Sequence, residues 1–127
     1  MKRVMISILN SLVQEAVVQV INRSGTVAEC LTTTQPDEII YQLKASFAQV
    51  FLLDITRREE GLFENRMKLI QEIRQELPGM KICLLVDNLS HPDVLSKVKA
   101  AKREGWIDCF FYEDVSSDYL KDVLDTL

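Results

Sequence analysis

The amino-acid sequence predicts an α/β domain built on a doubly wound parallel sheet, and three observations support this fold class. Short apolar segments alternate five times with longer amphipathic segments. No Pro-rich or Gly-rich linker interrupts this alternation. The third apolar segment, residues 50–53, consists of four consecutive large apolar residues followed by Asp54. Such a run is typical of a strand that helices cover on both faces.

The first two strand–helix units are predicted from changes in apolar periodicity. Residues 4–9 and 26–31 are rich in apolar and β-branched side chains and predict two strands. Between them, apolar residues recur at helical spacing over residues 12–21, and Gly25 suits the left-handed conformation that follows a helix. Thr34 is the predicted cap of the second helix, with an acid three residues later. The apolar stripe of this helix is predicted to be Ile39, Ile40, Leu43 and Phe47.

Three further strands are predicted at residues 50–54, 82–86 and 109–112. Helices follow each of them; the fourth helix closes at Gly105, and Ser116 caps the fifth. The apolar stripe of the third helix is predicted to be Phe63, Met67, Ile70, Ile73 and Leu77.

Five such units predict a flavodoxin-like (βα)5 domain over residues 1–127, with strand order 2-1-3-4-5. Right-handed crossovers between parallel strands would place the helices on both faces of the sheet. No apolar run approaches the roughly 20 residues needed to cross a bilayer, and the apolar run near the N-terminus is too short for a secretory signal. We therefore expect a cytoplasmic protein that does not contact membranes.

Composition narrows the possible functions further. The net charge of −4 argues against direct nucleic-acid binding, because such domains usually carry a basic face. Cys30, Cys83 and Cys109 are isolated in three apolar segments, without C-x-x-C spacing. This pattern predicts buried thiols in a reducing compartment rather than disulfides or a zinc site.

Polar residues are predicted to meet at the carboxyl edge of the sheet, where open α/β sheets bind their ligands. Asn10 would lie beside Asp54, with Asp87 and Tyr112 at the ends of the fourth and fifth strands. No glycine-rich loop follows the first strand, so the sequence predicts no flavin or dinucleotide cofactor. It also offers no nucleophile paired with a histidine base, so we expect no enzyme activity.

The layout resembles the receiver domain of bacterial two-component response regulators over essentially the whole chain. The resemblance depends on residues 50–53 leading into Asp54, on Gly61-Leu62 before the third helix, and on the endings of the fourth and fifth strands. It implies that Asp54 is the candidate phospho-acceptor. It also implies that acids at the end of the first strand help to hold Mg²⁺, and that a hydroxyl residue and a lysine bind the phosphoryl group.

The sequence departs from the receiver pattern at each of these supporting positions. Leu9 and Asn10 replace the acids, so Asp54 and Asn10 would form a weak Mg²⁺ site or none. Asp87 and Tyr112 replace the hydroxyl residue and the lysine at the switch positions. Two unit charges about 4 Å apart repel by about 4 kcal/mol at an effective dielectric constant near 20, so a phosphorylated Asp54 beside Asp87 would be unfavourable.

We therefore predict a degenerate receiver, or pseudo-receiver, that acts through protein–protein contacts and is independent of phosphorylation or only weakly phosphorylated at Asp54. The resemblance implies a sensor kinase or an output domain as partner. It also implies a possible homodimer through the face made by the fourth helix, the fifth strand and the fifth helix. The alternative prediction is a flavodoxin-like domain that binds a small ligand in the crevice around Asn10, Asp54 and Asp87.

Overall fold

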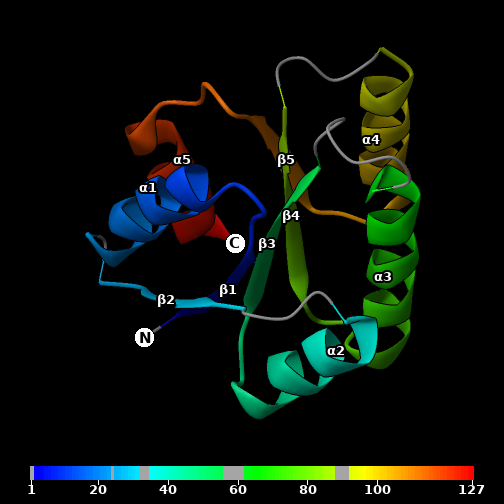
Figure 1. Cartoon of the computed structure of the whole chain (residues 1–127), viewed down its shortest axis with the longest axis horizontal. Coiled ribbons are helices and arrows are strands. Elements are labelled where there is room, and N and C mark those ends of the chain that lie inside the picture. Colours follow the sequence, from blue (N-terminus) through cyan, green and yellow to red (C-terminus); the bar gives the residue numbers. More distant parts are fainter. Residues whose placement is uncertain (1, 24, 32–34, 56–61, 88–91) are drawn as a thin grey trace.

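The computed structural model describes residues 2–23, 25–31, 35–55, 62–87 and 92–127 of the chain. Within these ranges, strands and helices alternate strictly (Figure 1). The strands are β1 (Arg3–Ser7), β2 (Val27–Cys30), β3 (Val50–Ile55), β4 (Lys81–Val86) and β5 (Cys109–Tyr112). The helices are α1 (Ser11–Asn22), α2 (Pro36–Ala45), α3 (Leu62–Glu76), α4 (Pro92–Glu104) and α5 (Ser117–Thr126).

The strands form one parallel sheet in the order β2-β1-β3-β4-β5. This confirms the predicted flavodoxin-like, doubly wound fold and its strand order. The central strand, β3, pairs with β1 from Val50 to Leu53 and with β4 along its whole length. All six residues of β3 are buried, as the apolar run before Asp54 predicted.

Helices cover both faces of the sheet: α1 and α5 lie on one face, and α2, α3 and α4 lie on the other (Figure 1). Alternate residues of β3 supply the two halves of the core. Phe51 and Leu53 pack in the cluster that includes α2, α3 and α4, whereas Val50 and Leu52 pack in the cluster with α1 and α5. Burying each large apolar side chain contributes about 1.5–3 kcal/mol, so β3 anchors both layers.

The helix ends agree only partly with the predictions. Ser116 caps α5 as predicted, its Oγ accepting the Tyr119 N–H at 3.2 Å. The N-cap of α2 is Gln35, which makes no side-chain capping bond, so the prediction of Thr34 at this position is wrong. Thr34 itself lies outside the described residues. Phe47 was predicted on the apolar stripe of α2, but the helix ends at Ala45 and Phe47 is 84% exposed.

The structure also contradicts the prediction of three buried free thiols. Cys83 of β4 and Cys109 of β5 are partners in the parallel register and form a disulfide. Cys30, at the end of β2, is a free and exposed cysteine. The pairing could not be seen in the sequence, because 26 residues separate the two cysteines and only the strand register places them opposite each other.

None of the helices in the described ranges is both long enough and apolar enough to span a bilayer.

Candidate functional site

Asp54 lies near the carboxyl end of β3 and is only 3% exposed. Both of its carboxylate oxygens accept hydrogen bonds from the protein. The Leu9 backbone N–H donates to Oδ2 at 3.1 Å, and Nη2 of Arg66 donates to Oδ1 at the same distance. Asp54 is therefore held in a buried ion pair, with each oxygen already bound.

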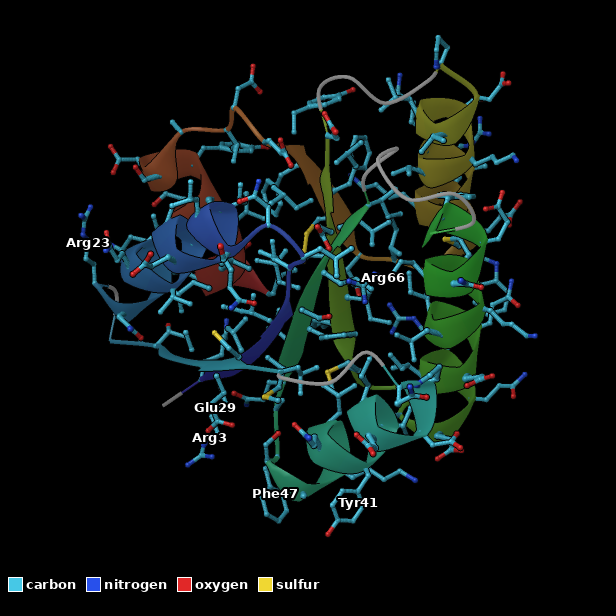
Figure 2. All side chains as sticks on the ribbon, in the orientation of Figure 1. Arg3, Arg23, Glu29, Tyr41, Phe47 and Arg66 are labelled. Atoms are coloured by element: carbon cyan, nitrogen blue, oxygen red, sulfur yellow. A yellow bond between two sulfur atoms is a disulfide. The ribbon has the colours of Figure 1, made fainter. Side chains whose placement is uncertain are left out.

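Arg66 reaches this carboxylate from α3, and in Figure 2 it lies between that helix and the sheet. The residue is 5% exposed. Its Nη1 donates to Ser7 Oγ and its Nη2 donates to the Ser7 carbonyl oxygen, both at 3.1 Å. Nε is buried and has no acceptor within the described part of the chain. The guanidinium thus connects α3 to the ends of both β1 and β3.

The position of Arg66 follows from helical geometry. It lies three residues after Phe63 and four before Ile70, so it shares the face that α3 turns toward the core. An ionised arginine on this face requires a charged or polar partner, because an isolated buried charge is very unfavourable. Asp54 and Ser7 provide that partner set. Sequence reasoning missed both Arg66 and its partner Ser7.

Two opposing effects act on the Asp54 carboxyl. Burial removes it from water and raises its pKa, whereas the Arg66 charge and the Leu9 amide lower it. Burial is the largest of these effects, so the pKa of Asp54 is raised above its ordinary value. The charge that acts directly on the carboxylate is that of Arg66. The predicted repulsion by Asp87 stays a prediction.

Asn10 has a structural function at the same edge of the sheet, at the start of α1. It is the N-cap of α1, and its Oδ1 accepts the backbone N–H groups of Leu12 at 3.0 Å and Val13 at 3.2 Å. These bonds satisfy two of the amides that a helix start leaves unpaired. The amide oxygen that was the candidate metal ligand is therefore directed at the helix end.

These contacts do not fit a Mg²⁺ ion, which requires several oxygen ligands around it. In Asp54 one oxygen faces a cation of the protein itself and the other an amide, and the oxygen of Asn10 caps a helix. Among the described residues, no group of three or more His, Cys, Asp or Glu side chains is arranged to hold a metal.

The two predicted switch positions lie on neighbouring strands of the same edge. Asp87 directly follows β4, is 6% exposed, and donates its backbone N–H to the Ile55 carbonyl at 3.2 Å. Tyr112 is the last residue of β5, pairs with Val86 in the register, and is 39% exposed. Its ring meets that of Phe110 edge to face, with 6.1 Å between the centroids. Gly61, part of the receiver resemblance, lies outside the described residues.

The surface over the described residues has three notable hollows, one of which reaches this edge, where Leu12, Val13 and Glu113 line it. The hollows have volumes of about 510, 750 and 330 Å³. Asn10, Asp54 and Asp87 line none of these three. They therefore give no support to a small-ligand crevice at those residues.

Comparisons with known proteins identify the fold but not a sequence family. No family model matches the chain, and no curated protein matches it. Among solved structures, a CheY-like protein, TadZ, from Pseudomonas aeruginosa is 13% identical at a TM-score of 0.79, with 99% of this chain and 98% of that chain covered. A response regulator from Thermotoga maritima is 16% identical at a TM-score of 0.77, with 98% and 95% covered.

A longer protein shows the same likeness over part of its length. NtrX from Brucella abortus is 12% identical at a TM-score of 0.75, and the match covers 99% of this chain but 26% of that one. Such low identities establish the architecture and not the activity. The chain therefore has the fold of the CheY-like receiver domains of response regulators.

Proposed function

We propose that this chain is a receiver-like signalling domain that acts through protein–protein contacts and not through metal-dependent phosphorylation of Asp54. The receiver fold supports the general assignment to signalling. The buried ion pair between Arg66 and Asp54 is the observation that carries the rest of the proposal. Its partner would be a sensor kinase or an output domain, as the resemblance implies.

In this proposal Arg66 takes over the electrostatic function that a receiver assigns to its metal ion. The guanidinium supplies the positive charge next to the Asp54 carboxylate from within the protein. Attack of an Asp54 oxygen on a phosphorus atom would convert the carboxylate into an uncharged acyl group and so break its ion pair with Arg66. Breaking a buried ion pair costs about 3–5 kcal/mol, which corresponds to about two to four orders of magnitude in rate.

The residues at the two switch positions, Asp87 and Tyr112, also lead us to expect no response to phosphorylation. A ligand shifts a conformational equilibrium only by its differential affinity for the two states. Asp87 is an acid and Tyr112 a partly exposed phenol, so neither offers a cationic contact to a phosphoryl group on Asp54. Little free energy would therefore be available to rearrange α4 and β5.

The proposed setting is the bacterial cytoplasm, where two-component signalling occurs. The Cys83–Cys109 disulfide is more typical of oxidising compartments, so this location stays a prediction that the redox state of the two cysteines can test.

The direct test is phosphorylation by a small-molecule donor. The chain is incubated with acetyl phosphate and Mg²⁺ and analysed by intact-protein mass spectrometry, beside the Asp54→Asn/Arg66→Met variant as matched control. This double substitution removes both charges of the pair and so leaves neither one buried alone. We expect no phosphorylated species in either protein. Mg²⁺-dependent phosphorylation that is absent from the double variant would overturn the proposal.

A second measurement tests the protein-contact part of the proposal. In a strain that lacks the gene, we expect the wild type and the Asp54→Asn/Arg66→Met variant to restore signalling equally. If the wild type restores signalling and the folded double variant does not, the Asp54 carboxylate is required. That outcome would contradict the proposed independence from phosphorylation.

A further inference from the structure

Phe47 combines two unfavourable features at one position. It directly follows the C-cap of α2 and has φ = +56°, the single positive value for a non-glycine residue within the described ranges. This left-handed conformation is costly for a bulky side chain, and glycine is the usual residue after a helix. The Phe47 side chain is also 84% exposed. Strain held at an exposed aromatic residue points to a function for that residue.

Tyr41 adds to the same surface. It lies on α2, six residues before Phe47, and is 71% exposed. Figure 2 shows both rings projecting from the same end of the molecule, away from the sheet. We refer to Tyr41 and Phe47 together as the aromatic knob. Each aromatic side chain can bury about 150–250 Å², so the knob presents a large apolar area to solvent.

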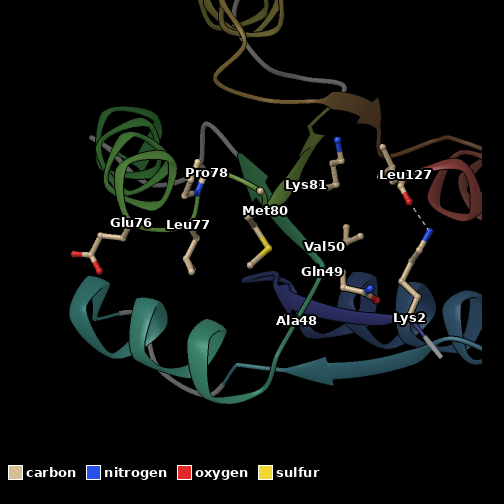
Figure 3. Close-up of a pocket in the computed structure, with 11 residues that line it drawn as sticks. Lys2, Ala48, Gln49, Val50, Glu76, Leu77, Pro78, Met80, Lys81 and Leu127 are labelled. Atoms are coloured by element: carbon tan, nitrogen blue, oxygen red, sulfur yellow. Dashed lines mark hydrogen bonds between the residues drawn. The ribbon is translucent and has the colours of Figure 1, made fainter.

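A hollow of about 510 Å³ begins at the next residues of the chain. We call it the amino-edge hollow, since it lies at the edge of the sheet where the strands begin. Figure 3 shows its apolar side chains together with the lysines at its rim. Phe47 does not line the hollow of its own chain. Its lining includes Ala48, Gln49, Glu76, Leu77, Gly79 and Met80.

We propose that this face is the contact between two copies of the chain, in which Phe47 of each copy enters the amino-edge hollow of the other. A knob and a hollow that are adjacent on one surface satisfy a two-fold axis, because each copy supplies both halves of the contact. The proposal is independent of the assignment made for Asp54.

The area and the charges of this surface agree with a second copy as the occupant. Four aromatic side chains and the surface they cover would bury about 1,000–1,600 Å² in total, around the lower limit for a specific interface. The lining carries both signs of charge: Lys2 and Lys81 lie there together with Glu76, which also forms an ion pair with Lys44 at 2.5 Å. Such a mixed lining avoids like-charge repulsion between identical faces, whereas a strongly charged partner would require one dominant sign.

Two substitutions remove the two halves of the contact separately. Phe47→Gly removes the ring and places the residue best suited to positive φ at the end of α2. Gly79→Gln fills the hollow from inside; a Cβ at Gly79 would meet no atom within 4 Å, and the residue needs no positive φ. Tyr119→Ser is the matched control, because Tyr119 is an exposed aromatic residue on α5, in the other helix layer.

Sedimentation velocity over a concentration series measures the association. We expect a reversible wild-type dimer, which Phe47→Gly and Gly79→Gln each weaken by about 30-fold or more, as for interface hot spots. Tyr119→Ser should leave the dimer unchanged. Phe47→Gly should also raise or preserve the melting temperature of the monomer, which separates loss of contact from misfolding.

A mixture of the two variants provides a complementation test. The Phe47→Gly chain keeps its hollow and the Gly79→Gln chain keeps its knob, so one of the two contacts can form between them. We expect a mixed dimer of intermediate affinity. A monomeric wild type at every concentration, or association that Tyr119→Ser alone abolishes, would overturn the proposal. The second of these outcomes would instead favour the face of α4, β5 and α5. Growth beyond a dimer would refute the two-fold arrangement.

Discussion

Replacing Arg66 with Met removes the cation beside Asp54 while keeping a long apolar side chain on α3. Asp54 then retains the Leu9 N–H, but its other oxygen loses its donor, and both oxygens of Ser7 lose theirs. Removing one partner of a buried ion pair lowers the free energy of unfolding by about 3–5 kcal/mol. Native domains have total stabilities of about 5–15 kcal/mol, so we expect the variant to lose a large part of its free energy of unfolding at neutral pH.

This loss should depend on pH with a definite sign. Burial already raises the pKa of Asp54, and removing the arginine charge raises this pKa further. A carboxyl whose folded-state pKa is raised binds its proton more readily in the folded state. The contribution of such a carboxyl to the stability of the folded state is fully present below its pKa in the unfolded state, about 3.9, and is lost as the pH rises through its pKa in the folded state. The difference in free energy of unfolding between the wild type and Arg66→Met should therefore become smaller as the solution is acidified.

Urea unfolding followed by circular dichroism, repeated from acidic to neutral pH, measures both effects. The Asp54→Asn/Arg66→Met double variant completes the cycle and should be more stable than the Arg66→Met single variant at neutral pH, because no unpaired charge remains. Three results would refute the reasoning. The first is that Arg66→Met loses less than about 1 kcal/mol of unfolding free energy at neutral pH. The second is that this loss does not change with pH. The third is that the double variant is less stable than Arg66→Met alone.

Four further predictions concern other parts of the molecule. Asn10→Ala should lower the free energy of unfolding by about 1 kcal/mol in urea titrations, because two amides of α1 lose their acceptor; an unchanged value would contradict the capping function. Asp87→Asn should be neutral or stabilising near neutral pH if Asp87 repels Asp54, and a loss above about 1 kcal/mol would show that this carboxylate has an essential donor. Iodoacetamide should modify Cys30 alone in the unfolded, unreduced protein, as counted by mass spectrometry; three modified cysteines would mean that the disulfide is absent. Beryllofluoride with Mg²⁺ should leave the amide NMR signals of α4 and β5 unchanged, whereas large shifts that require Asp54 would show a working phosphoryl switch.

The fold could be predicted because each element leaves a local pattern in the sequence. The run from Val50 to Leu53 requires burial on both faces, and only a central parallel strand provides it. Chain order and crossover handedness then restrict the strand order to few possibilities. For the same reason the position of Asp54 at the carboxyl edge followed from the sequence.

The contacts of that site could not be predicted in the same way. Arg66 lies among the apolar positions of α3, but a charged residue in a helical stripe is usually taken to extend toward water. Its burial depends on Ser7 and Asp54, which are distant in the sequence. The placement of Phe47 was wrong because no glycine or proline marks the end of α2. The partner of Cys83 depends on strand register, which no local pattern records.

The Arg66 guanidinium also restricts the order in which a metal-dependent acceptor site could evolve or be engineered in this domain. Removing the arginine first would pass through a protein with an unpaired buried carboxylate. Introducing acids first, at Leu9 and Asn10, changes exposed positions and leaves the existing ion pair intact. Once the arginine is then removed, the clustered carboxylates would require a cation from solution, and folding would become linked to the Mg²⁺ concentration. In the proposed function, independence from divalent ions would thus be a property that this one side chain gives to the fold.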